Sequence, residues 1–276
     1  MLRLTDGTLV FSASDITAHL ACPHLEQQRL AIALGRRARP YGAVDAHAEL
    51  TRRRGDAHEA AQVARLTAEA GGDVLDLSED FDWRDRAAVE RAAERTREAM
   101  AAAAALIYQP TFFDGRWLGR ADFLRRTPAG YEVLDTKLSR QVKPATVHQL
   151  ALYARLVDAL PVAHVILGDG RTEAVDLRRF SALHRRVAAH VEAVVQRASR
   201  PEKIEHCSIC DFEGECRAHR VRIDDLSLVA GARREQRTAL ALAGIETVAA
   251  LAGADPGFPT LHQQAASAPG IPRPGP

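Results

Sequence analysis

Apolar and polar positions along the chain predict a helical first part, a strand-rich middle and further helices after it. Helical spacing and strong helix formers predict helices over 12–34, 44–70, 84–105, 144–158 and 179–198. The first is interrupted at Cys22-Pro23, because proline lacks the backbone N–H that a helix interior needs. Short β-prone runs predict strands over 73–77, 106–113, 116–126, 131–137, 162–167 and 173–177. The order of these elements predicts an α/β domain with a mixed sheet.

Turn residues between these runs predict which strands are neighbours. Asp114-Gly115 and the Thr-Pro-Ala-Gly segment 127–130 each separate two successive strands of the middle part. Gly168-Asp169-Gly170 separates the last two strands. We therefore expect three hairpins.

Three charged side chains lie on the middle pair of strands. Positions two apart share one face of a strand, so Asp135 and Lys137 point the same way. The hairpin partner can bring Asp122 beside them. Buried charges are costly unless they are paired or bind a metal, so this group is poor core material. Its most natural use is to hold a divalent cation against a phosphate.

Composition limits the classes of protein that fit this pattern. The 276 residues are 46% hydrophobic, enough for a packed core, and no apolar run approaches the length of a membrane span. The first residues lack a basic segment followed by an apolar one, so we expect no secretory signal and a cytoplasmic protein. The net charge of +1 gives no global attraction to nucleic acid, and local arginine groups are either solvated helix faces or phosphate contacts. Lysine occurs only at 137, 143 and 203, so each lysine is informative. We therefore expect Lys137, two residues after Asp135, to have a specific role rather than to be one of many surface charges.

The cysteines suggest a metal centre. Three form a C-x2-C-x5-C pattern and the fourth lies far upstream, the four being Cys207, Cys210, Cys216 and Cys22. Clustered cysteines in a cytosolic protein suggest metal ligation, and four thiolates suit tetrahedral zinc or a 4Fe–4S cluster. Local spacing favours zinc, whereas the remote fourth cysteine does not fit a compact zinc ribbon. The alternatives are small buried hydrophobic residues, or ligation by nearby histidines, namely His24, His206 and His219.

The end of the chain differs from the rest. Residues 223–254 are apolar at helical spacing with glycine breaks, which is typical of a helix-hairpin-helix-like segment that contacts nucleic acid, or of a small helical linker bundle. Residues 255–276 are rich in proline and glycine, and we expect a disordered tail. From the abrupt end we expect a further domain downstream.

Taken together, these residues resemble the RecB-like branch of the PD-(D/E)xK nucleases, specifically its iron–sulfur members, which include exonucleases of CRISPR adaptation and AddAB-type recombination nucleases. The matching motifs run from Ser12 to Cys216. They are Ser-x-Ser with Cys-Pro, the helical His58, Gly-Arg-Ala-Asp at Asp122, Asp-x-Lys at Asp135 and Lys137, Gln-x3-Tyr at Gln149 and Tyr153, and C-x2-C-x5-C. The match departs from the commoner pattern in having Leu134 before an aspartate rather than a glutamate.

The resemblance implies a restriction-endonuclease-like core, a mixed sheet flanked by helices, with a helical N-terminal part and a C-terminal cysteine clasp over residues 1–222. It implies a 4Fe–4S cluster held by Cys22 and the three clustered cysteines. It also implies a nuclease, with single-stranded DNA or DNA ends as the substrate, acting in DNA repair, recombination or defence. Exonuclease action on single-stranded ends is the expected activity.

The resemblance also assigns roles within the site. His58, Asp122, Asp135 and the backbone carbonyl of Thr136 would bind Mg²⁺ or Mn²⁺, with Lys137 orienting or deprotonating a water. Gln149 and Tyr153, one helical turn apart, would reach the DNA backbone or the site. Glu59 receives no role, because adjacent helical residues point about 100° apart.

Simpler interpretations stay open for each residue. His58 can be a polar helix residue, the charged pairs Asp122 with Arg120 or Asp135 with Lys137 can be ordinary ion pairs, and Tyr153 can be core. For the whole chain, the alternatives are a catalytically silent nucleic-acid clamp or a cysteine-metal interaction module.

Overall fold

The computed structural model describes residues 1–40 and 46–254. The chain divides into two compact units, Met1–Ala198 and Ser199–Pro276. The clustered cysteines thus belong to the second unit, whereas we expected them to complete a first domain that ends at 222. The expected disordered tail, 255–276, lies outside the described residues, and so do residues 44–45 of the second predicted helix.

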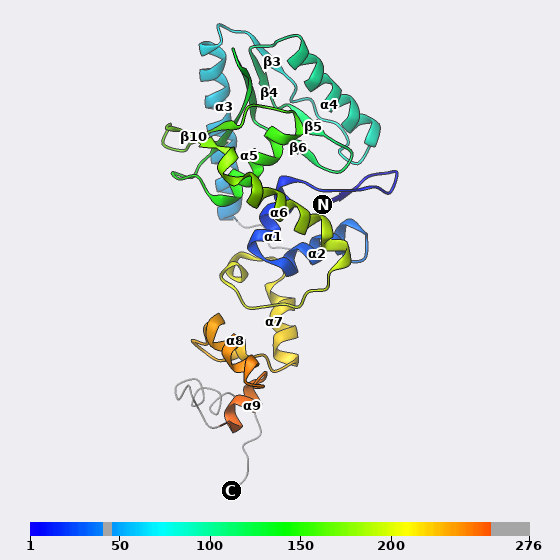
Figure 1. Cartoon of the computed structure of the whole chain (residues 1–276), viewed down its shortest axis with the longest axis vertical. Helices are drawn as coiled ribbons and strands as arrows, with labels where there is room; N and C mark the ends of the chain where they lie inside the picture. The colour runs from blue at the N-terminus through cyan, green and yellow to red at the C-terminus, as the bar shows by residue number, and fades with distance from the viewer. Residues whose placement is uncertain (41–45, 255–276) are drawn as a thin grey trace. The chain divides into compact units, whose positions relative to one another are not determined.

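The first unit contains a mixed sheet of six strands flanked by helices, so this part of the chain has an α/β fold (Figure 1). The strands of the whole first unit are β1 (Leu2–Arg3), β2 (Leu9–Val10), β3 (Val74–Asp76), β4 (Leu106–Tyr108), β5 (Thr111–Phe113), β6 (Leu118–Arg120), β7 (Phe123–Thr127), β8 (Gly130–Lys137), β9 (Val162–Leu167) and β10 (Thr172–Asp176). Its helices are α1 (Ala13–Ala21), α2 (Pro23–Ala33), α3 (Ala46–Glu69), α4 (Arg86–Ala101), α5 (Pro144–Leu156) and α6 (Ser181–Glu192).

The strand order in the large sheet is β10-β9-β8-β7-β4-β3. Two of the predicted hairpins, β7–β8 and β9–β10, are confirmed within it as antiparallel neighbours. Strands β8 and β9 are parallel, and α5 forms the connection between them, as a parallel pair requires. The third predicted hairpin, at Asp114-Gly115, pairs β5 with β6 in a separate two-stranded sheet.

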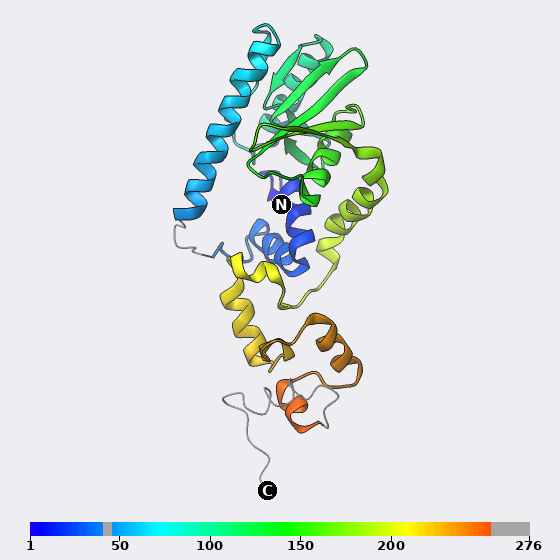
Figure 2. The same ribbon diagram turned by 90° about the vertical axis from the view of Figure 1, so that its left-hand side faces the viewer.

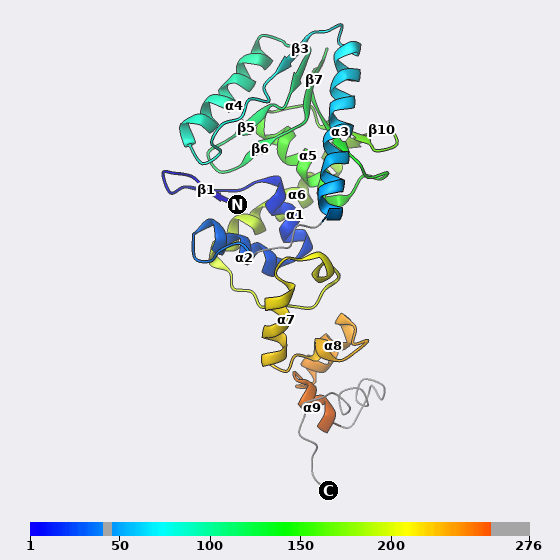
Figure 3. The same cartoon turned by 180° about the vertical axis from the view of Figure 1, so that it is seen from behind.

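Helices cover both faces of the sheet. Successive residues of a strand point to opposite faces, so one strand packs against helices on both sides. On β8, Leu134 faces α3 and joins a buried cluster with Leu66. Its neighbour Val133 faces α5 and joins the main core with Leu150 and with Ile16 of α1. Figures 2 and 3 show the long α3 running along one side of the sheet. The carboxyl end of β8 therefore lies between α3 and α5, where both can supply side chains.

The predicted strands 106–113 and 116–126 are each broken in two. Gln109 takes a left-handed backbone conformation with φ of 50° directly before Pro110, so β4 ends there and β5 starts afresh. The backbone N–H of Gln109 donates to the carbonyl of Asp122 (2.8 Å), at the second break, between β6 and β7. The two breaks thus meet. The short β1–β2 hairpin was not predicted at all.

The second unit is helical as far as it is described. It contains a 3₁₀ turn at Glu205–Ile209, α7 (Glu213–Arg222), a 3₁₀ turn at Leu226–Leu228, α8 (Arg234–Leu242) and α9 (Val248–Gly253). A small core holds the last three elements together, made of Leu226, Val229, Leu240, Val248 and Leu251. No described helix in either unit is long and apolar enough to cross a membrane.

Candidate active site

Asp122 and Asp135 meet where β7 and β8 run side by side. Phe123 pairs with Leu134, so the same register continued by one residue sets Asp122 opposite Asp135. The carboxylate of Asp122 accepts two hydrogen bonds from Thr136, one from its backbone N–H (2.6 Å) and one from its hydroxyl (2.7 Å). The prediction that the hairpin brings Asp122 beside Asp135 is therefore confirmed.

Asp135 is fully buried and touches two of the predicted site residues. Its Oδ2 forms an ion pair with the ammonium of Lys137 on the same strand face. Its Oδ1 accepts a hydrogen bond from the side-chain amide of Gln149 on α5 (3.2 Å). The Asp135–Lys137 pair that we considered as an ordinary ion pair is thus formed within one strand, and it lies beside a second carboxylate.

Burial and mutual repulsion make this site electrostatically strained. Burial, and next the charge of Asp122, raise the pKa of Asp135 to about 7. Burial also raises the pKa of Asp122, against the pull of Lys137 and the two hydrogen bonds from Thr136. Burial disfavours the charge on Lys137, but the surrounding carboxylates outweigh it and raise its pKa. The ammonium therefore stays protonated, and the two carboxylates compete for one cation.

Glu59 is a site residue that our reading of the sequence missed. Its Oε1 accepts hydrogen bonds from the hydroxyl of Tyr108 (2.9 Å) and the amide of Gln109 (2.8 Å), and its charge adds to the upward shift in the pKa of Asp122 and of Asp135. A signal for this was present. Glu59 precedes Val63 and Leu66 by four and seven positions, and those two residues form the stripe of α3 that packs on the sheet.

His58 is placed differently from the predicted ligand. Its Nε2 approaches the carbonyl of Ile166 on β9 at 3.4 Å, and within the described residues it hydrogen-bonds neither Asp122 nor Asp135. The 100° that separates neighbours on a helix turns Glu59 towards the carboxylates instead.

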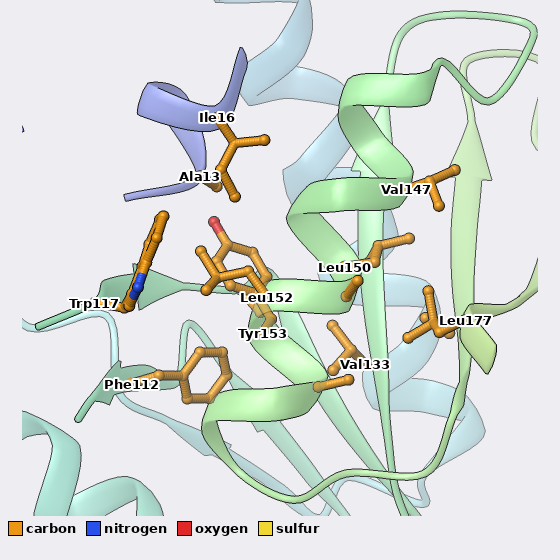
Figure 4. Packing of buried hydrophobic residues seen from close by; sticks show 14 of the residues in the cluster. Ala13, Ile16, Phe112, Trp117, Val133, Val147, Leu150, Leu152, Tyr153 and Leu177 are labelled. Atoms are coloured by element: carbon orange, nitrogen blue, oxygen red, sulfur yellow. The ribbon is translucent and has the colours of Figure 1, made fainter. Parts of the chain in front are cut away.

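Gln149 and Tyr153 share one face of α5, as predicted. The amide of Gln149 donates to the hydroxyl of Tyr153 (3.2 Å) as well as to Asp135. The ring of Tyr153 is buried against Phe112 and the start of α1 (Figure 4). It lies so close to Gly119 that a Cβ there would be 2.6 Å from its Cε1. Tyr153 is therefore both a core residue and a neighbour of the carboxylates.

Among the described residues, no three His, Cys, Asp or Glu side chains converge into a ready-made metal cage. The chemistry of the carboxylate pair nevertheless fits a hard divalent cation, since Mg²⁺ is commonly bound by one or two carboxylates and keeps several waters. One observation supports the fit. The ammonium of Lys137 contacts Oδ2 of Asp135 but does not offset burial and repulsion at the two carboxylates, whose pKa values stay raised, so a further cation would be stabilised there.

The cysteines lie in both units. Cys22 forms the junction between α1 and α2, and the other three surround the start of α7. Cys207 is buried, with its thiol 3.7 Å from the carbonyl of Glu202. Three cysteines within ten residues are soft donors of the kind that a soft-metal or iron–sulfur site uses, but among the described residues the structure does not gather three of these side chains around one point.

Comparisons with known proteins do not identify a function for this site. No protein-family profile matches the chain, and neither does any curated protein sequence. The chain is similar to a solved structure described as "Crystal structure of SSO0001", with 16% identity over 74% of this chain and 84% of that chain, and a TM-score of 0.40. A likeness at that level carries no argument about function.

Proposed function

We propose that the chain is a metal-dependent deoxyribonuclease that hydrolyses phosphodiester bonds, with a restriction-endonuclease-like core of the RecB-like PD-(D/E)xK kind. The observation that carries the proposal is the meeting of Asp122, Asp135 and Lys137 at one end of a buried hairpin. Two carboxylates are held there with a single neighbouring ammonium, at the cost of a raised pKa at Asp135. Strongly perturbed carboxylates of this sort are concentrated at functional sites.

Asp122 and Asp135 are the groups that would hold Mg²⁺ or Mn²⁺, with the carbonyl of Thr136 as a further oxygen and Glu59 as an added acidic neighbour. The bound ion would supply an activated water and positive charge for the scissile phosphate. Thr136 fixes the carboxylate of Asp122 through two hydrogen bonds, and Gln149 fixes that of Asp135 through one. The proposal keeps His58 as a further candidate ligand, which would have to turn its Nε2 away from the carbonyl of Ile166.

Lys137 has the role of a cation rather than a base in this proposal. Its raised pKa keeps the ammonium protonated, so it donates to a phosphate oxygen and offsets the charge that develops there. About a third of the side chain is exposed, which leaves it accessible to a substrate.

The test is cleavage of end-labelled single-stranded DNA with Mn²⁺, using anaerobically purified protein. Lys137→Ala and Asp122→Ala should abolish cleavage and leave the fold intact. Lys143→Ala is the matched control, because Lys143 is an exposed lysine at the start of α5. Activity retained in Lys137→Ala would refute the proposed site. If the wild type and all three variants bind DNA but none cleaves it, the chain would be a catalytically silent nucleic-acid clamp instead.

We further propose that Cys22, Cys207, Cys210 and Cys216 are ligands of a 4Fe–4S cluster, with structural zinc as the alternative. The three clustered thiols in the second unit support this, together with the donor chemistry of cysteine. Metal analysis decides between the two: iron and sulfide in equal amounts favour the cluster, and zinc in a colourless, inactive protein favours the interaction module. A helicase or a second nuclease domain is the proposed partner.

A further inference from the structure

An open pocket of about 380 Å³ lies in the first unit and is not explained by the carboxylate site. Its volume falls within the range of about 300–1,000 Å³ that is usual for small-molecule sites. The floor is apolar and buried, formed by Val10, Phe11 and Leu118. Such a floor can accept a flat, apolar group.

One side of the pocket is polar and positively charged. Arg29 is fixed there by hydrogen bonds to the carbonyl (2.8 Å) and hydroxyl (2.9 Å) of Ser14, and the hydroxyls of Ser14 and Ser12 lie 2.9 Å apart. The buried Asp15 forms an ion pair with the guanidinium of Arg29 at 3.4 Å. The guanidinium is thus held in place, while a third of its side chain stays exposed. This wall can bind a phosphate.

The pocket is also lined by an aromatic ring and a second arginine. The guanidinium of Arg120 lies over the ring of Trp83, 4.6 Å from its centroid, and 5.4 Å from that of Phe81. Both Arg120 and Trp83 line the pocket. Guanidinium planes and indole rings are the surfaces on which unpaired nucleic-acid bases stack.

Two chains of contacts join this pocket to the carboxylates. Tyr153 lines the pocket, and its hydroxyl accepts from Gln149, which also donates to Asp135. In the second chain of contacts, Arg120 donates to the side chain of Gln109 (3.2 Å), whose amide donates to Glu59. The pocket is therefore next to the site at which the phosphodiester would be cut.

We propose that this pocket binds one unpaired nucleotide of a DNA strand, with its base against Trp83 and Arg120 and its phosphate at Arg29 and Ser14. The inference rests on the proposed nuclease function and adds a binding subsite to it, a pocket of about 380 Å³ that would hold one nucleotide of the strand beside the carboxylates. The Ser-x-Ser segment at the start of α1 thereby gains a role in binding.

Tryptophan fluorescence tests this without any cleavage. The only tryptophans are Trp83, in the pocket, and Trp117, which is 2% exposed and donates to Glu192. The full chain is titrated with 5′-phosphorylated hexathymidylate in EDTA. We expect saturable quenching that disappears in Trp83→Phe and needs roughly tenfold more DNA in Arg29→Gln, since a charge-assisted hydrogen bond is lost.

Ser14→Ala gives a second, milder variant, and Arg91→Gln on the exposed face of α4 is the matched control. Blunt hairpin DNA should not quench. Quenching that persists in Trp83→Phe, or an affinity unchanged in both Arg29→Gln and Ser14→Ala, would overturn the inference. Cleavage without quenching would refute the nucleotide pocket and leave the proposed nuclease function standing. Quenching without cleavage by the Mn²⁺-loaded wild type would refute the nuclease function and leave the pocket standing.

Discussion

Replacing Asp135 by asparagine should stabilise the protein in EDTA at alkaline pH. The folded protein raises the pKa of Asp135 from 3.8 to about 7, so between these values the unfolded chain ionises while the folded protein retains the proton. The free energy of unfolding must therefore fall as the pH rises through this window, and the loss is complete above pH 7. Asparagine has a similar shape and does not ionise.

The size of the effect follows from the shift. A difference of about three pKa units corresponds to about 4 kcal/mol. Water that enters the site reduces this, so we expect a gain of about 2–4 kcal/mol for Asp135→Asn at pH 8 and almost none at pH 4. For a unit of this length, each kcal/mol raises the melting temperature by about 2–4 °C.

The assay is thermal unfolding from pH 4 to pH 9 in EDTA, followed by tryptophan fluorescence, because both tryptophans lie in the first unit. The curves of wild type and Asp135→Asn should meet near pH 4 and separate as the pH rises. Added Mn²⁺ should raise the melting temperature of wild type more than that of the variant, since it binds the folded carboxylates. A variant that melts below wild type at pH 8 in EDTA would refute the reasoning, because the buried charge would then be stabilising.

Three further substitutions test separate features. Gly119→Ala forces a methyl group into the ring of Tyr153, which should cost about 1–3 kcal/mol and lower the melting temperature; an unchanged value would show that the ring moves freely. Glu59→Gln keeps its hydrogen-bond acceptor but removes a charge, so the pH window of the Asp135 effect should move to lower pH; an unmoved window would contradict the electrostatic effect of Glu59 on Asp135. Cys22→Ser should lower bound iron and thermal stability, and full iron content with an unchanged melting temperature would exclude Cys22 as a ligand.

Local physics made much of the fold predictable. The helix break at Pro23 follows from a missing N–H, and the three hairpins follow from glycine-containing turns. The split of 106–113 was not foreseen, because the conformation of Gln109 depends on a hydrogen bond to Asp122, thirteen residues away. The β1–β2 hairpin has two residues per strand, too few for an alternating pattern.

The site was predictable where its residues are close in sequence. Asp122, Asp135 and Gln149 belong to one hairpin and the helix after it, so strand alternation and helical spacing place them correctly. Glu59 comes from a helix whose rotation on the sheet is set by Val63 and Leu66. The motif points to His58, and the 100° between helical neighbours then excludes Glu59, whereas the apolar stripe places Glu59 on the face of α3 that packs on the sheet.

The carboxylate site also has a consequence for the order of folding. Asp122 and Thr136 are fourteen residues apart, as are Asp135 and Gln149, whereas Glu59 is separated from Tyr108 by forty-nine. Closing the shorter loops costs less chain entropy, so β7, β8 and α5 can assemble before α3 docks. The repulsion between carboxylates would then reach its full strength only at the last step, when α3 adds its acidic side chain. In hydrogen exchange, α3 should accordingly open before the hairpin that it covers.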